Sequence, residues 1–303
     1  MAVSTTRRYA AFGLTVDSDV DLPELESTSV SHDGEADVRI VTDSISTPPD
    51  APTDHSIHVA SGADHYLVYD YATVRIQDGR RITIDPRADA PHEIVRHVLL
   101  GPALNHLLHQ REYYVLHAST VAFDDLAVAF VGPSGQGKTT TAMACLAAGH
   151  RVLSDDVAAI RLTDDGPVVQ GGYGAIKLHP EAAGHFDAPV GEPTRTCSKR
   201  DRHFHSLPHD VVTDPIPLAG VYLLEDGPTL ELSRLSPSEQ VMTLVDNTYT
   251  IGTLNSGDTA TVNFETCAAV ADQTAVKRLR RPREFDALPK VADAVCADIG
   301  MDH

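Results

Sequence analysis

The sequence lacks any apolar run of the roughly 18 residues that a membrane-spanning helix needs. Two arginines lie within Met1–Tyr9, but no apolar segment follows them, so a secretory signal is not expected. The expected compartment is therefore the cytoplasm, and no membrane partner is expected.

Cysteine is scarce, and the four residues present lie far apart in the chain. They are Cys145, Cys197, Cys267 and Cys296, and no two of them form a Cys-x-x-Cys pair. This spacing suits neither a zinc site nor a disulfide framework, so we interpret all four as reduced thiols. Cys145 falls in an apolar helical stretch and is expected to lie in the core.

Lysine is rarer than its usual share: 5 lysines and 19 arginines stand against 31 aspartates and 12 glutamates. The net charge of −19 would repel nucleic acid and anionic membranes, so neither is an expected partner. One interpretation is an acidic protein without special adaptation. Abundant aspartate with scarce lysine favours a second, a halophilic protein whose self-repulsion is screened by dense counterions.

Residues 1–88 contain short runs of alternating apolar and polar residues separated by Asp, Ser, Pro and Gly. This pattern predicts a small, β-rich, antiparallel module, which is a candidate for acceptor recognition. The expected strands are Val38–Val41, Ser56–Ala60, Tyr66–Tyr69, Thr73–Gln77 and Arg81–Ile84, with an Asp-Gly turn at Asp78–Gly79 and a loop over Ser44–Asp54.

Residues 89–303 have the pattern of an α/β domain. A helical period over Pro91–Gln110 is interrupted at Gly101-Pro102. Further on, the order strand, loop, helix, strand predicts a parallel sheet covered by helices. The expected elements are strands at Tyr113–Phe123, Leu126–Val131, Arg151–Leu153, Ile216–Leu224 and Thr229–Leu235, and helices at Thr139–Ala148 (closed by Gly149), Ser238–Leu244 and Leu288–Ile299.

A glycine-rich segment lies between an apolar strand and a helix and matches G-x-x-x-x-G-K-[ST]; we call it the glycine loop. Its glycines would let backbone N–H groups surround phosphate oxygens, and the following helix N-terminus would favour the negative charge. Lys138 would reach the β- and γ-phosphates of ATP, and the Thr139 hydroxyl would hold Mg²⁺. A chance match in a glycine-rich turn is the alternative. The expected nucleotide-binding residues are Gly132, Pro133, Ser134, Gly135, Gln136, Gly137, Lys138, Thr139 and Thr140.

A pair of aspartates, Asp155 and Asp156, ends an apolar strand, with Asp156 18 residues after Lys138. The carboxyl ends of parallel strands meet at one crevice, so both carboxylates are expected near the glycine loop. Phosphoryl transfer to a hydroxyl needs a carboxylate for the metal and a base for the nucleophile. A helix cap or a solvated aspartate pair is the alternative interpretation.

The segment Leu116–Asp156 resembles the catalytic domain of HPr kinase/phosphorylase and its relatives: a histidine on the strand before the loop, the loop itself, and a Gly-His-Arg turn that leads to the double aspartate. The opening Tyr9–Leu25 resembles HPr-kinase-like enzymes found with peptide-maturation systems, including lasso peptide clusters. The resemblance implies the kinase fold shared with phosphoenolpyruvate carboxykinases, an ATP- and Mg²⁺-dependent serine-type kinase, and a homo-oligomer.

Carried over to this sequence, the resemblance makes Asp156 the catalytic base, His117 the active-site histidine and Asp155 a second acid near the metal. The family signature after the double aspartate carries a Glu and an Arg, and alignment places Val169 and Gly171 at those positions. The metal would therefore be held by fewer protein ligands here, and neither the reverse reaction nor HPr as substrate is implied.

Basic residues are the remaining candidates for contacts with substrate. Lys177 lies in a strand that resembles the family, and a cationic loop contains Arg195, Lys199, Arg200 and Arg202. We name Lys177, Lys199, Arg200 and Arg202 as substrate candidates, because cations neutralise a transferring phosphoryl group. The alternative, for this loop and for the basic run Lys277–Arg283, is that these side chains pair with nearby acids.

Three functions fit this sequence. The first is a kinase that phosphorylates a Ser or Thr hydroxyl of a protein or peptide, with Asp156 as base and Lys138 at the phosphates. The second is a kinase for a small-molecule hydroxyl, and the third is a non-catalytic, nucleotide-gated binding module. The retained Asp156 and His117 favour catalysis.

Overall fold

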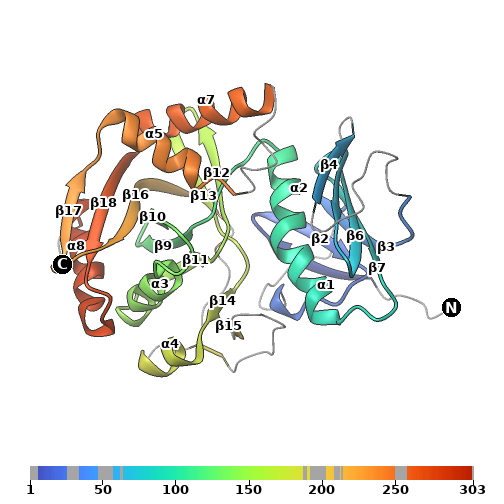
Figure 1. Ribbon diagram of the computed structural model, residues 1–303, viewed down its shortest axis with the longest axis horizontal. Helices are drawn as coiled ribbons and strands as arrows, with labels where there is room; N and C mark the ends of the chain where they lie inside the picture. Colours follow the sequence, from blue (N-terminus) through green and yellow to red (C-terminus); the bar gives the residue numbers. More distant parts are fainter. Residues whose placement is uncertain are drawn as a thin grey trace.

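The computed structural model describes residues 6–25, 34–46, 57–61, 64–186, 190–191, 203–207, 212, 214–249 and 258–301. Two large sheets and the helices packed on them form a mixed α/β structure (Figure 1). The expected α/β class is confirmed in this coarse form. Among the described residues, no helix combines the length and apolar character that a membrane-spanning segment requires.

The N-terminal sheet has seven strands in the order β1-β2-β3-β7-β6-β5-β4. The strands are β1 (Arg7–Ala11), β2 (Leu14–Ser18), β3 (Val38–Thr42), β4 (Ile57–Ser61), β5 (Asp64–Val68), β6 (Ala72–Gln77) and β7 (Arg81–Pro86). The prediction of a purely antiparallel module is wrong, because β3 runs parallel to both β2 and β7. The long connection between β2 and β3, which includes the 3₁₀ turn η1 (Pro23–Leu25), permits that parallel pairing.

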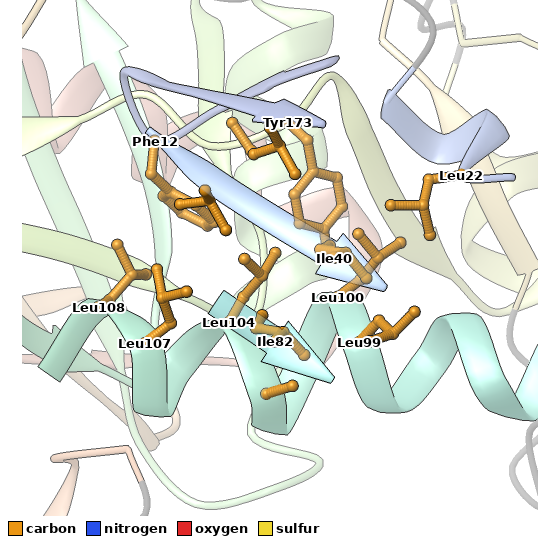
Figure 2. Packing of buried hydrophobic residues seen from close by; sticks show 14 of the residues in the cluster. Phe12, Leu22, Ile40, Ile82, Leu99, Leu100, Leu104, Leu107, Leu108 and Tyr173 are labelled. Carbon is orange, nitrogen blue, oxygen red and sulfur yellow. The ribbon is translucent and has the colours of Figure 1, made fainter. Parts of the chain in front are cut away.

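One long helical segment covers the inner face of this sheet. It consists of α1 (His92–Val98), a π-helical turn η2 (Leu99–Ala103) and α2 (Leu104–Gln110). The expected interruption at Gly101-Pro102 is this π turn, which accommodates Pro102 without ending the helix. Figure 2 shows the leucines of the segment against Ile40 and Ile82 of the sheet.

The core of the N-terminal sheet extends into the rest of the chain. Phe12, in the β1–β2 turn, packs edge-on against Tyr173 with ring centroids 6.1 Å apart (Figure 2). Val115 and Ala159 belong to the same buried cluster. The two parts therefore pack as one body around this helical segment, and a division at residue 88 stays a prediction.

The second sheet has nine strands, and its main path is β11-β9-β10-β16-β13-β12-β8. These are β8 (Tyr114–Leu116), β9 (Ser119–Phe123), β10 (Leu126–Val131), β11 (Arg151–Ser154), β12 (Ala158–Thr163), β13 (Gly166–Gln170) and β16 (Ile216–Asp226); β18 (Ala275–Arg281) joins β16, and β17 (Glu231–Arg234) joins β18. The sheet is mixed: β10, β16 and β18 are parallel neighbours, whereas β9 is antiparallel to β10 and β11.

The expected single strand over Tyr113–Phe123 is two strands in different parts of this sheet. The first, β8, pairs with β12, and the second, β9, lies between β10 and β11. The chain changes partners at His117 and Ala118. Because both strands are buried, the apolar run in the sequence gives no sign of the break.

Helices cover both faces of the second sheet (Figure 1). On one face α3 (Lys138–Ala147) and α8 (Pro289–Asp298) share a buried cluster that includes Phe130, Cys145 and Val295. On the other face α5 (Pro237–Asp246) and α7 (Asp258–Gln273) contribute Leu244 and Val270. The remaining elements are α4 (Pro180–His185), the 3₁₀ turn η3 (Phe285–Ala287) and the small sheet of β14 (Ala175–Leu178) and β15 (His203–Ser206).

The cysteine prediction can be checked at three positions. Cys145, Cys267 and Cys296 are buried, unpaired thiols, and Cys145 lies in the core as expected. Burial raises the pKa of the Cys145 thiol, which suits an inert core residue. Cys197 lies outside the described residues.

Candidate functional site

The glycine loop connects the end of the buried strand β10 to the start of α3, as the sequence predicts. Gly132, Gly135 and Gly137 take positive φ values of 144°, 89° and 86°. Residues with a Cβ avoid these conformations, so the three glycines are what allow the chain to turn back over the helix end. The first turn of α3 then presents backbone N–H groups to whatever lies in the loop.

Two residues from outside this loop hold it: Asn247, which the sequence did not indicate, and Arg281, which the sequence showed only as part of the basic run Lys277–Arg283. The Asn247 side-chain oxygen, just after α5, accepts the Gly132 N–H at 2.9 Å. Further along the loop, the buried Arg281 of β18 donates to the Gln136 carbonyl oxygen at 3.0 Å. The loop is therefore held at two points, Gly132 and Gln136, by side chains from outside it.

Lys138 is folded onto the glycine loop. Its ammonium donates to the Gly132 carbonyl oxygen at 2.7 Å, and the residue is only 7% exposed. An ammonium at the centre of such a loop is placed to approach the oxygens of a bound phosphate.

Asp155 follows β11 and is 5% exposed. Its Oδ1 accepts from the Ser119 hydroxyl at 2.6 Å and from the Thr139 hydroxyl at 2.8 Å, and its Oδ2 accepts from the Lys177 backbone N–H at 3.1 Å. Burial raises the pKa of Asp155, as does the charge of Asp156, while these three hydrogen bonds oppose the rise. The carboxylate is thus directed at the first turn of α3.

Asp156 leaves the strand in a left-handed conformation, with φ of 69°. This turn separates its side chain from that of Asp155 and directs it to Lys177 on β14, whose ammonium lies 2.7 Å from Asp156 Oδ2. Burial lowers the pKa of Lys177, but the Asp156 carboxylate raises it, and the net direction is upward. Lys177 therefore remains charged and forms a partly buried ion pair.

His117 lies in the break between β8 and β9. Its Nδ1 is 3.0 Å from the Asp156 backbone carbonyl oxygen, which can only accept, so Nδ1 carries the proton. The neutral ring then keeps a lone pair on Nε2. Burial and the charge of Lys138 lower the pKa of His117, which favours the neutral ring, although Asp156 and Asp155 oppose this effect.

Two cavities meet at this site. The smaller, about 190 Å³, is lined by the glycine loop, Asp156, Lys177 and the start of α4. The larger, about 750 Å³, extends from Gly132 to the C-terminal end of α5 and is lined by Asn247 and Tyr249 among others. His117 and Ser134 line both cavities. The site thus has a polar, charged compartment and a larger, more apolar one.

The donor set of the site can be tested against Mg²⁺. The Thr139 hydroxyl and the Asp155 carboxylate, 2.8 Å apart, provide one hydroxyl and one carboxylate oxygen. Magnesium in phosphate-transfer sites is typically held by one or two carboxylates together with substrate phosphates, so this set fits. Val169, which the resemblance aligns with a glutamate, is fully buried. The described residues contain no cluster of three or more His, Cys, Asp or Glu that could hold a metal without substrate.

The structure brings together the central candidates from the sequence: His117, the glycine loop, Asp155, Asp156 and Lys177. Arg195, Lys199, Arg200 and Arg202 lie outside the described residues. The basic run Lys277–Arg283 largely follows its alternative interpretation. Its members pair with acids, Lys277 with Asp298, Arg278 and Arg280 with Glu225, and Arg283 with Asp226.

Other residues near the charged compartment were not predicted. His97 of α1 is exposed and lies close enough to Lys177 and Asp156 for their charges to act on its ring. Tyr249 packs edge-on against His117, with ring centroids 5.6 Å apart. Neither belongs to a motif, so only the tertiary structure could identify them.

No model of a known protein family matches this chain, and no curated protein matches it. Among solved structures, the chain is similar to the HPr(Ser) kinase/phosphatase from Coxiella burnetii, with 12% identity over 61% of this chain and 94% of that chain and a TM-score of 0.32. Both the identity and the TM-score are low, so the function is argued below from the residues of this chain.

Proposed function

We propose that this protein is an ATP- and Mg²⁺-dependent kinase that transfers the γ-phosphoryl group to a Ser- or Thr-type hydroxyl of a protein or peptide. One observation carries the proposal: a cavity of about 190 Å³ is lined by both the glycine loop with Lys138 and the Asp156–Lys177 pair. A triphosphate in the loop would place its terminal phosphate beside a carboxylate, which is the arrangement that phosphoryl transfer to a hydroxyl requires.

The nucleotide would occupy the glycine loop, with backbone N–H groups and the α3 N-terminus around its phosphates. On binding, the Lys138 ammonium would exchange its carbonyl partners for phosphate oxygens. The Thr139 hydroxyl and Asp155 would hold Mg²⁺, which supplies positive charge against the phosphate oxygens when it is bound. Ser119 and the Lys177 backbone N–H would keep Asp155 in its orientation.

Asp156 would act as the base. Its carboxylate takes the proton of the acceptor hydroxyl as the oxygen forms a bond to the γ-phosphorus, and the bond from that phosphorus to the bridging oxygen breaks to release ADP. Lys177 would hold Asp156 in its ionised form and offer positive charge to the transferring group. His117, which lines the same cavity, would contact the acceptor beside the reacting hydroxyl and so help to orient it.

A specific observation favours a second candidate, a kinase for a small-molecule hydroxyl. The larger cavity, about 750 Å³, has the size of a small-molecule pocket and opens beside His117. A hydroxyl-bearing molecule there would reach the same phosphate and the same base. A peptide could instead place one or two side chains in this space.

The test is a transfer assay with ATP labelled in the γ-phosphate, Mg²⁺ and a cell extract from which ATP has been removed. We expect label on a protein or peptide, and a Ser or Thr phosphate in the product by mass spectrometry. Label on a small molecule supports the second candidate, and absence of any transfer or hydrolysis supports a nucleotide-gated binding module. The variant Asp156→Asn should bind ATP with similar affinity while turnover falls about 10²- to 10⁴-fold; unchanged turnover removes Asp156 from the role of base.

A further inference from the structure

The N-terminal sheet carries an arginine cluster formed by Arg39, Arg80 and Arg81, with Arg111 from the end of α2 at its edge. These residues line a cavity of about 410 Å³, together with Asp17, Glu35, Ala36 and Asp37. Arg39 on β3 and Arg81 on β7 are directly paired across the two parallel strands. Arg80 precedes Arg81, and its carbonyl oxygen accepts the Arg39 N–H at 2.8 Å.

The pairing of Arg39 with Arg81 is unfavourable by itself, because like charges directly opposite on neighbouring strands repel each other. The chain offers ample acids for compensation, with 43 Asp and Glu against 24 Lys and Arg. Other arginines on this sheet are compensated: Arg8 pairs with Asp17 and Arg75 with Asp64. Arg39, Arg80 and Arg81 are exposed. The charge of Arg80 acts on Asp37 and helps to lower the pKa of that carboxyl, and Arg81 donates to the Thr83 hydroxyl at 3.4 Å. Among the described residues, no acid forms an ion pair with Arg39 or Arg81.

The backbone fixes the fourth arginine at the edge of the cluster. Arg111, just after α2, donates to the Gly79 carbonyl oxygen at 2.9 Å and lies 3.9 Å from Asp37. Asp37 in turn accepts from the Thr15 backbone N–H and hydroxyl, at 2.9 and 2.7 Å. These contacts hold the rim of the cavity and leave the paired Arg39 and Arg81 open to solvent.

We propose that the arginine cluster binds an acidic segment of a protein or peptide. Guanidinium groups bind carboxylates in a planar, two-point geometry, and neighbouring strands about 4.8 Å apart present two of them side by side. An extended peptide with acidic residues at alternate positions directs its carboxylates to one side and would match this arrangement. A continuous polyanion such as nucleic acid fits less well, because Asp17, Glu35 and Asp37 interrupt the surface, whereas single carboxylates spaced along a peptide can meet Arg39 and Arg81 alone.

This binding site is independent of the proposed phosphoryl transfer, since it lies on the other sheet and needs no nucleotide. It adds a recognition function to the N-terminal sheet: an acidic partner would be held there by charge and hydrogen bonds.

Fluorescence anisotropy with the full chain tests the proposal. The ligand is a labelled ten-residue peptide of alternating Glu and Ser, without nucleotide and at about 0.1 M salt, where the screening length is about 10 Å. We expect saturable binding of this peptide. The double variant Arg39→Ser/Arg81→Ser should bind it at least about tenfold more weakly, because it lacks the guanidinium groups that donate charge-assisted hydrogen bonds. The matched control is Arg234→Ser, an exposed strand arginine of the second sheet, which should bind like the wild type. Equal thermal midpoints of the three proteins show that the substitutions leave the fold intact.

Four results would overturn the proposal. The first three are no saturation of the wild type by the acidic peptide, equal binding by the double variant and the wild type, and equal binding of a peptide with Gln in place of Glu. Tighter binding of a ten-nucleotide oligo-dT than of the acidic peptide would also reject a peptide ligand, and would assign the cluster to nucleic acid instead.

Discussion

The Lys177 ammonium lies 2.7 Å from the Asp156 carboxylate, and the two side chains are 13% and 22% exposed. This ion pair joins β14 to the end of β11 and lies beside the glycine loop. The pair contributes to the stability of the fold and, in the proposed function, to catalysis. Substitutions at the two residues can distinguish these two roles.

A double-mutant cycle on this pair is the first prediction. Lys177→Met leaves the Asp156 carboxylate partly buried without its cation, and we expect a loss of about 3 kcal/mol in the free energy of unfolding. Asp156→Asn removes the other charge, and the double variant should be about 1–3 kcal/mol more stable than the sum of the single losses predicts. Urea unfolding monitored by circular dichroism measures all four proteins. Simple additivity would show that the contact contributes no coupling.

The carboxylate of Asp155 is the subject of the second prediction. Asp155→Asn retains the size of the side chain but removes the anionic oxygen beside the Thr139 hydroxyl. We expect the Mg²⁺ concentration for half-maximal binding of a fluorescent ATP analogue to rise at least about tenfold. Asp125→Asn, in an exposed turn after β9, is the matched control. An unaltered Mg²⁺ dependence would remove Asp155 from the metal site.

Much of this site is encoded locally, and for that reason the sequence predicts it. The glycine loop needs only an apolar strand, glycines that accept positive φ, and a helix, and all three lie within a single short segment of the chain. Asp155 and Asp156 follow β11, the strand that comes directly after α3 in the chain, and Asp155 contacts Thr139 in the first turn of that helix. These are the residues for which the sequence expectation and the structure coincide.

The rest of the site depends on tertiary structure. Asn247 and Arg281 reach the loop from positions 115 and 145 residues away in sequence from the groups that they contact. Each contacts a backbone atom of the loop, so no motif marks it. The position of β9 between β10 and β11 has the same origin: strand order follows from how buried strands pair, and several orders bury the same residues.

Asn247 provides the third prediction. Its side chain is the partner of the Gly132 N–H, so Asn247→Ala leaves the first amide of the glycine loop without an acceptor. A lost hydrogen bond of this kind should weaken nucleotide binding about five- to tenfold. Isothermal titration with ATP measures the change.

The control for this prediction is Asn263→Ala on α7, a helix that packs against α5, β13 and β18. Both variants should unfold at nearly the same temperature. If Asn247→Ala binds ATP as tightly as the control does, Arg281 and the glycines of the loop are enough to hold it, and the Asn247 hydrogen bond does not contribute to nucleotide binding.

The fourth prediction concerns acid stability and His109 of α2. Burial lowers the pKa of His109 from 6.5 to about 4, although its hydrogen bond to the Tyr249 carbonyl oxygen opposes the shift. Because the folded pKa is depressed, the unfolded chain binds the proton first as the pH falls. The stabilisation is therefore complete above about pH 6.5 and is lost as the pH falls toward 4.

The uptake of one proton by the unfolded chain over this pH interval lowers the free energy of unfolding by up to about 3 kcal/mol. His109→Gln keeps a donor for the Tyr249 carbonyl oxygen and removes the titration, so its free energy of unfolding should fall less steeply than that of the wild type between pH 6.5 and 4. The exposed His92→Gln at the start of α1 serves as the control and should follow the wild type. Parallel curves for His109→Gln and the wild type would mean that His109 is already protonated in the folded protein at pH 6, and that the acid sensitivity arises from the carboxylates.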